Sequence, residues 1–203
     1  AYGDVIFDGA IPPALKAFDT RGLVVTLGTF SKILCPGLRL GWVAASPELR
    51  EKYVILKQST DLHTPTLTQM LAARWLESAD FDANLARIRA LYRERRDVMV
   101  AALEQEMPGL RFTRPAGGLF VWLELPEGID ARELLKLCLQ RQVAFVPGAS
   151  FFAGNPRPNT ARLNFSAMPP ERIREGVRRM AAALREMTAA APARAPEPAG
   201  ASA

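Results

Sequence analysis

Helical spacing of apolar residues is the main pattern in this chain. Apolar side chains recur three, four or seven positions apart in several segments, and this spacing is typical of amphipathic helices. It predicts helices over residues 46–58, 64–75, 80–107 and 169–188, and a further helix that starts at Asp130 and contains Leu134, Leu137 and Cys138. Ser46 and Asp130 stand at helix N-cap positions, and Pro47 occupies a first helical position, which supports these limits.

Short apolar runs between the helices predict strands. Residues 23–27 and 39–45 are apolar, as in strands buried on both faces. Further strands are predicted over residues 110–113, 119–125, 143–146 and 160–166. Together these elements indicate an α/β chain. From residue 188 onward alanine, proline and glycine replace the periodic pattern, which predicts a disordered tail over residues 189–203.

Composition is that of an ordinary globular protein. Of the 203 residues 49% are hydrophobic and 23% charged, and the net charge of +5 comes from arginines interspersed with acids. This distribution argues against nucleic-acid binding. No apolar run approaches the ~20 residues that span a bilayer, and no signal peptide is visible, so we expect a cytoplasmic protein without a membrane partner.

Cysteine and histidine are scarce. The two cysteines, Cys35 and Cys138, lie far apart, and His63 is the single histidine. A disulfide framework and a histidine-rich metal site are therefore not expected. We expect no bound metal.

Residues 27–42 bring reactive side chains together between two predicted strands. Lys32 lies in the connection, and Thr29 and Ser31 beside it offer hydroxyl donors. Arg39 opens the second predicted strand with a planar, five-donor guanidinium that suits a phosphate. These residues predict an anion site beside a lysine.

The spacing around Lys32 differs from that of a nucleotide-triphosphate loop. Gly-Thr-Phe-Ser-Lys has no second glycine before the lysine and no serine or threonine directly after it. A lysine among apolar strands and near a cationic side chain loses its proton more easily than a solvated one, and a neutral amine condenses with an aldehyde. We therefore expect Lys32 to be a Schiff-base lysine.

Arg162 is the second position that points to a ligand. It stands inside the predicted apolar strand 160–166, where burying a guanidinium is costly unless an anion meets it. A carboxylate removes that cost through two parallel hydrogen bonds. The alternative is an edge strand from which the arginine reaches solvent.

The segments Leu-Gly-Thr-Phe-Ser-Lys-Ile-Leu and Pro-Gly-Leu-Arg-Leu-Gly-Trp resemble the cofactor-lysine signature of fold-type-I, pyridoxal-phosphate-dependent class I and II aminotransferases. They are most similar to the 2-aminoadipate aminotransferase-like branch. The resemblance implies the C-terminal part of a large mixed-sheet domain in residues 1–80, and a connecting helix with a small α+β domain in residues 81–188. It also implies that the chain is the C-terminal half of a longer, homodimeric enzyme and is inactive alone.

The resemblance assigns roles to six residues. Lys32 would hold pyridoxal 5'-phosphate covalently, and Arg162 would bind the substrate α-carboxylate. The other four would bind the cofactor: Thr29, Ser31 and Arg39 at the phosphate, and Tyr2 at the ring oxygen. The implied reaction moves an amino group between an amino acid and a 2-oxo acid. The implied donor is 2-aminoadipate or a broad aromatic, branched and acidic range.

Two other functions share these motifs. The effector-binding, aminotransferase-like domain of a MocR/GntR-type transcriptional regulator carries the same lysine motif behind a winged-helix module. Its usual residues before the motif differ from Tyr2-Gly3-Asp4, and the sequence shows no basic helix-turn-helix pattern, so we favour the enzyme. The second alternative is another fold-type-I reaction, such as decarboxylation or β-elimination, because the cofactor supplies the chemistry and the site selects the bond.

Overall fold

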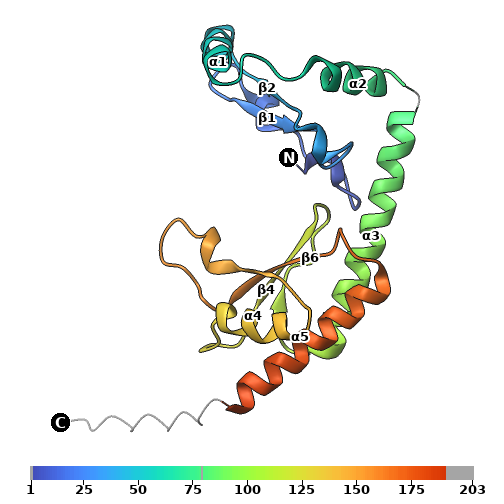
Figure 1. Cartoon of the computed structure of the whole chain (residues 1–203), viewed down its shortest axis with the longest axis vertical. Helices are drawn as coiled ribbons and strands as arrows, with labels where there is room; N and C mark the ends of the chain where they lie inside the picture. Colours follow the sequence, from blue (N-terminus) through green and yellow to red (C-terminus); the bar gives the residue numbers. More distant parts are fainter. Residues whose placement is uncertain (1, 79, 191–203) are drawn as a thin grey trace, which may run out of the picture. The chain divides into compact units, whose positions relative to one another are not determined.

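A computed structural model describes residues 2–78 and 80–190, which form two compact units (Figure 1). Unit 1 comprises the described residues up to 94 together with 115–118, and unit 2 comprises residues 95–114 and 119–190. The sequence suggests a boundary at residue 80. In the structure the division falls inside helix α3 (Asp80–Glu106), so each unit contains part of this helix.

Unit 1 contains short 3₁₀ turns, a two-stranded antiparallel ribbon and two further helices. Strand β1 (Thr26–Thr29) pairs with β2 (Gly41–Ala44). The 3₁₀ turns are η1 (Gly3–Val5), η2 (Leu15–Phe18) and η3 (Pro36–Leu38), and the helices are α1 (Pro47–Thr60) and α2 (Thr66–Leu76). The predicted N-cap of α1 is confirmed, because the Ser46 hydroxyl accepts a hydrogen bond from the backbone N–H of Leu49.

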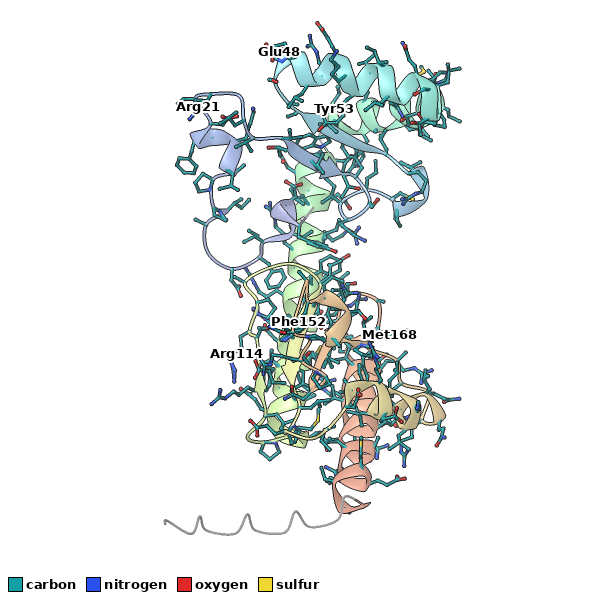
Figure 2. All side chains as sticks on the ribbon, turned by 90° about the vertical axis from the view of Figure 1, so that its left-hand side faces the viewer. Arg21, Glu48, Tyr53, Arg114, Phe152 and Met168 are labelled. Atoms are coloured by element: carbon teal, nitrogen blue, oxygen red, sulfur yellow. The ribbon has the colours of Figure 1, made fainter. Side chains whose placement is uncertain are left out.

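The prediction that β1 and β2 are buried strands is wrong for the part of the chain that the structure describes. Leu27 is 67% exposed, and Trp42 and Val43 are 48% and 50% exposed. Among the described residues the two strands pair only with each other, and no neighbouring strand is present to help cover their exposed apolar side chains. Apolar residues on α1 are exposed in the same way, among them Tyr53, labelled in Figure 2.

A small apolar core in unit 1 joins the N-terminal segment to α3. Val5, Ile33 and Leu85 are buried against one another, with partly buried aromatic residues around them. The side-chain amide of Asn84 donates to the carbonyl oxygen of Ile33 over 3.2 Å. Because Ile33 directly follows Lys32, this core fixes the backbone beside the lysine.

Unit 2 is built on a four-stranded antiparallel sheet with the order β3-β4-β6-β5, and helices α4 and α5 lie side by side against each other (Figure 1). The strands are β3 (Arg111–Phe112), β4 (Phe120–Glu124), β5 (Val146–Pro147) and β6 (Thr160–Asn164). The helices are α4 (Ala131–Gln140) and α5 (Pro170–Ala190), with the 3₁₀ turn η4 (Gly148–Phe151) after β5.

Two details of unit 2 differ from the prediction. The strand predicted over residues 143–146 is reduced to the two residues of β5. Helix α5 continues through Ala189 and Ala190, which were assigned to the tail. The rest of the predicted tail, residues 191–203, lies outside the described residues.

The two faces of this sheet carry different side chains. Val121, Leu123 and Leu163 are buried on one face and form the core of unit 2 with apolar residues of α4 and α5. Because side chains alternate along a strand, Trp122 and Arg162 lie on the opposite face, where they are directly paired across β4 and β6. The fold therefore places Arg162 on the sheet face opposite the apolar core.

Among the helices described, none is long and apolar enough to cross a membrane.

Candidate functional site

The connection between β1 and β2 begins with a tight turn that carries Lys32. The backbone N–H of Leu34 donates to the carbonyl of Phe30 over 2.9 Å, and the N–H of Phe30 donates to Leu40 over 3.1 Å. Lys32 is half-buried in this turn. Its amine makes no hydrogen bond or ion pair with any residue that the structure describes, so the amine is available to a ligand.

Thr29 and Ser31 meet directly before the lysine. Their hydroxyl oxygens lie 3.0 Å apart, and the backbone N–H of Ser31 donates to Thr29 Oγ1 over 3.1 Å. If Thr29 donates to Ser31, the hydroxyl hydrogen of Ser31 remains free to bind an anion. The structure thus brings together two of the predicted phosphate ligands.

Arg39 does not open a strand, as the sequence suggests, but ends the turn η3 in the left-handed region with φ of 50°. Its Nη1 donates to the carbonyl of Pro36 over 3.0 Å. No described residue accepts a bond from its Nε or Nη2. Gly41 is the register partner of Thr29, and Arg39 stands two residues before Gly41. Arg39 and Thr29 therefore belong to the same end of the ribbon.

Tyr2 is linked to the lysine turn through the small core. Its carbonyl oxygen accepts a hydrogen bond from the N–H of Val5 over 3.0 Å, and Val5 packs against Ile33. The Tyr2 side chain is 37% exposed. The predicted cofactor residues therefore all lie in unit 1, whereas Arg162 belongs to unit 2.

Arg162 lies close to two aromatic rings. Its guanidinium carbon is 4.1 Å from the ring centroid of Phe120 and 4.5 Å from that of Phe151. The Nε atom is buried and has no hydrogen-bond partner. Since β6 lies between β4 and β5, the alternative of an edge-strand arginine is wrong. A buried donor without a protein partner is the arrangement expected at a position that binds an anion.

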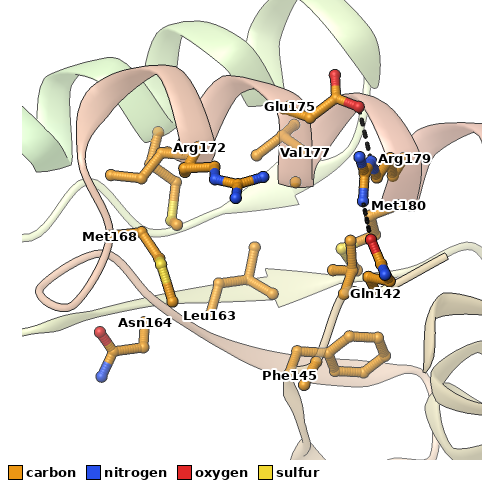
Figure 3. A pocket seen from close by; sticks show the side chains of 15 residues that line it. Gln142, Phe145, Leu163, Asn164, Met168, Arg172, Glu175, Val177, Arg179 and Met180 are labelled. Carbon is orange, nitrogen blue, oxygen red and sulfur yellow. Dashed lines mark hydrogen bonds and ion pairs between the residues drawn. The ribbon is translucent and has the colours of Figure 1, made fainter.

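A separate hollow of about 450 Å³ lies in unit 2 between α5 and residues 142–145 (Figure 3). Arg179 crosses one end of it, donating to Glu175 over 2.6 Å and to Gln142 over 3.3 Å. The arginines beside Glu175, Arg178 and Arg179, lower the pKa of that carboxyl to about 2. Sequence reasoning missed this hollow, because its lining comes from distant segments that share no motif.

No group of three metal-binding side chains occurs in residues 2–78 and 80–190. An amine with two hydroxyls beside it suits a ligand that has both a carbonyl group and an anionic group.

Residues 1–180 match the family model described as aminotransferase class I and II, which covers most of the chain. The chain belongs to this family. The predicted family is thereby confirmed, and the lysine motif on which that prediction rested lies inside the matched region.

Two curated aminotransferases illustrate the similarity. The chain is 46% identical over 186 residues to aromatic-amino-acid aminotransferase 1 of Thermococcus litoralis. The aligned residues cover 91% of this chain and 45% of that protein. The chain is 47% identical over 193 residues to the 2-aminoadipate transaminase of Thermus thermophilus, covering 93% of this chain and 48% of that protein. The chain thus spans about half the length of the curated relatives it matches.

A solved structure gives the same result for the fold. The α-aminoadipate aminotransferase LysN of Thermus thermophilus, complexed with N-(5'-phosphopyridoxyl)-L-leucine, matches with a TM-score of 0.88 and 44% identity. The match covers 93% of this chain and 49% of that structure. The predicted α/β fold, as part of a fold-type-I aminotransferase, is confirmed.

Transcriptional regulators also match this aminotransferase chain. The HTH-type regulator TauR of Rhodobacter capsulatus is 36% identical over 174 residues, which is 85% of this chain but 36% of the regulator. Similarity over these residues therefore includes proteins of two functional classes.

Proposed function

We propose that this chain forms the lysine-bearing part of a pyridoxal-phosphate-dependent aminotransferase. The observation that carries the proposal is Lys32, a half-buried amine without a partner among the described residues, one position from a pair of hydroxyls. An unpaired lysine amine can form a Schiff base with the carbonyl group of a cofactor.

The residues present fit this cofactor. Thr29, Ser31 and Arg39 would bind its phosphate, and the unpaired Nε and Nη2 of Arg39 supply donors for that purpose. Lys32 would hold the aldehyde carbon, and Tyr2 the ring oxygen. When bound, pyridoxal phosphate accepts the electrons of the bond broken at the amino acid's α-carbon.

The protein's own residues would supply positioning and proton transfer. Arg162 would bind the substrate α-carboxylate through the donors at the edge of its guanidinium and so orient the α-carbon. The Lys32 amine, once free, would take the proton from that carbon and then donate it to the bound cofactor. These roles need only the groups that the structure leaves unpaired.

For substrates, we propose an amino acid donor in the aromatic to 2-aminoadipate range and a 2-oxo acid acceptor. The names of the similar aminotransferases support this range. We also propose a homodimer for the longer protein and no turnover by these 203 residues alone. The exposed apolar residues of β1, β2 and α1 support the second point, because these faces lack the layers that would cover them.

The test compares two lysine variants of the full-length protein. Lys32→Ala should lose both the near-ultraviolet absorbance of the lysine-bound cofactor and turnover of amino acid with 2-oxo acid. Lys52→Ala, which changes an exposed lysine of α1, should keep both. Turnover at the wild-type rate by Lys32→Ala would refute the role of Lys32.

The second candidate is the effector-binding domain of a transcriptional regulator, which the match to TauR supports. Both candidates hold the cofactor at the same lysine, so cofactor binding does not separate them. Rapid transfer of the amino group to a 2-oxo acid supports the enzyme. Cofactor absorbance without turnover, together with sequence-specific DNA binding by the full-length protein, would support the regulator.

A further inference from the structure

The guanidinium of Arg162 lies close to two aromatic rings and has an unsatisfied donor. Phe120 and Phe151 lie 4.1 Å and 4.5 Å from its central carbon, and its buried Nε has no partner. All five N–H donors of an arginine lie in the guanidinium plane. Rings that pack near the central carbon therefore leave the donors at the edge available while limiting how the plane can turn.

We propose that Phe120 and Phe151 are positioning residues that hold the Arg162 guanidinium in one orientation and thereby set selectivity for substrates with an α-carboxylate over amines that lack it. The inference rests on the proposed function, since it deepens the role of Arg162 there. The two phenylalanines would act through the arginine, without a bond to the substrate.

Neighbouring elements hold the two rings in place. Phe120 stands on β4 two residues before Trp122, the register partner of Arg162, so its ring can cover the guanidinium from the adjacent strand. Phe151 comes from the end of η4, and Trp122 meets it edge-on with ring centroids 5.8 Å apart and an interplanar angle of 73°. Trp122 thus supports Phe151. We call Phe120 and Phe151, the two rings next to the Arg162 guanidinium, the aromatic clamp.

The clamp also changes the environment of the charge. Aromatic faces attract a cation through their quadrupole and displace part of the water around the guanidinium. A hydrogen bond from a cation to a carboxylate is stronger in such a partly desolvated site. A fixed plane also lowers the entropy lost when two parallel bonds to a planar carboxylate form.

The test uses Phe151→Leu in the full-length protein, with Phe152→Leu as the matched control. Leucine keeps an apolar side chain but has no flat face, and Phe152 packs near Trp122 without stacking on Arg162. Phe151→Leu should raise KM for the amino acid about tenfold with little change in kcat, because carboxylate binding is lost equally in the ground and transition states. Phe152→Leu should change KM less than twofold.

Two further measurements separate positioning from a general structural effect. Turnover of an amine lacking the carboxylate should be unchanged by Phe151→Leu, whereas partial unfolding would lower it and kcat together. Phe151→Tyr, which keeps the ring, should restore KM. Phe151→Leu should have no added effect in an Arg162→Lys background, since the phenylalanine acts through the arginine.

Failure of the clamp and failure of the proposed function give different results. If the wild-type protein turns over no amino acid, calorimetry with 2-oxoglutarate still reports the Arg162 site, and Phe151→Leu should weaken that binding about tenfold. An unchanged KM and unchanged 2-oxoglutarate affinity in Phe151→Leu would overturn the clamp. An equal effect of Phe152→Leu would also overturn it.

Discussion

The hydroxyl oxygens of Thr29 and Ser31 lie 3.0 Å apart at the end of β1, and Lys32 follows directly. This pair is the part of the candidate cofactor site with the most defined geometry. It fixes the turn through the backbone N–H of Ser31, and we propose that it also binds the cofactor phosphate. Stability and cofactor binding should therefore change together when it is altered.

Replacing Thr29 by valine tests this link. Valine has a similar shape but cannot accept the hydrogen bond from Ser31, so the free energy of unfolding should fall by about 1–2 kcal/mol. Denaturant unfolding measures this change, and equilibrium dialysis of the full-length protein should show weaker retention of pyridoxal phosphate. Thr26→Val, at a β1 threonine whose hydroxyl has no partner among the described residues, is the control. Equal losses in both variants would contradict the assigned role.

Two glycines of unit 2 should respond to alanine with opposite signs. A Cβ at Gly148 would lie 2.1 Å from Thr160 Oγ1 and 2.8 Å from Trp122, whereas nothing lies within 4 Å of one at Gly176. Gly148→Ala should therefore lower the free energy of unfolding by about 1–3 kcal/mol. Gly176→Ala, in the interior of α5, should raise it by about 0.5–1 kcal/mol, because alanine favours the helix.

Thermal denaturation of the two alanine variants, measured beside the wild type, checks the predicted signs. A rise of the midpoint in Gly148→Ala would show that the packing of η4 against Trp122 is not what requires glycine at position 148, and a fall in Gly176→Ala would contradict the prediction for α5. Because Phe151 ends η4, Gly148→Ala should also raise KM for the amino acid if the clamp operates.

Sequence information was sufficient where the determining contacts are local. The starts of the five helices agree with the prediction within two residues, because caps such as Ser46 and Asp130 act on the first turn of their own helix. Lys32, Thr29 and Ser31 are proposed together as site residues for the same reason, since they lie within four consecutive positions, and the structure brings the two hydroxyls together. The family resemblance then gave these residues a common role.

Burial and tertiary contacts could not be predicted from the same pattern. The apolar character of residues 23–27 and 39–45 shows which side chains favour burial, but not whether the covering layers lie in the same chain. β5 begins three residues later than predicted and pairs with β6 over two residues. The stacking of Phe120 and Phe151 on Arg162 joins three separate segments, and no spacing rule predicts it.

The two cysteines should differ in reactivity. Cys35 is exposed, whereas burial raises the pKa of the Cys138 thiol to about 11. Because the thiolate is the reacting form, a thiol reagent at pH 8 should label one cysteine in the folded protein and both after unfolding. Cys35→Ser should abolish labelling of the folded state. Rapid labelling of Cys138 without denaturant would contradict its burial in the core of unit 2.

Stability should depend on pH through Glu175. Its carboxylate accepts two hydrogen bonds of 2.8 Å from Arg178 and one of 2.6 Å from Arg179, and these lower its pKa from 4.5 to about 2. A carboxyl whose pKa is lower in the folded state stabilises the fold above its unfolded pKa, and this contribution disappears as the pH falls toward the folded pKa. Glu175→Gln should therefore lower the melting temperature at pH 7, and the difference from wild type should shrink between pH 4.5 and about 2.

Melting curves from pH 2 to pH 7 test this dependence. The effect should be modest and should weaken with added sodium chloride, since this ion pair is partly exposed and water and salt screen it. Glu127→Gln is the control, because the Glu127 side chain has no charged partner in the part of the chain that the structure describes. A melting-temperature difference for Glu175→Gln that stays constant down to pH 2 would show that Glu175 acts through packing, because its charge would then make no contribution that protonation removes.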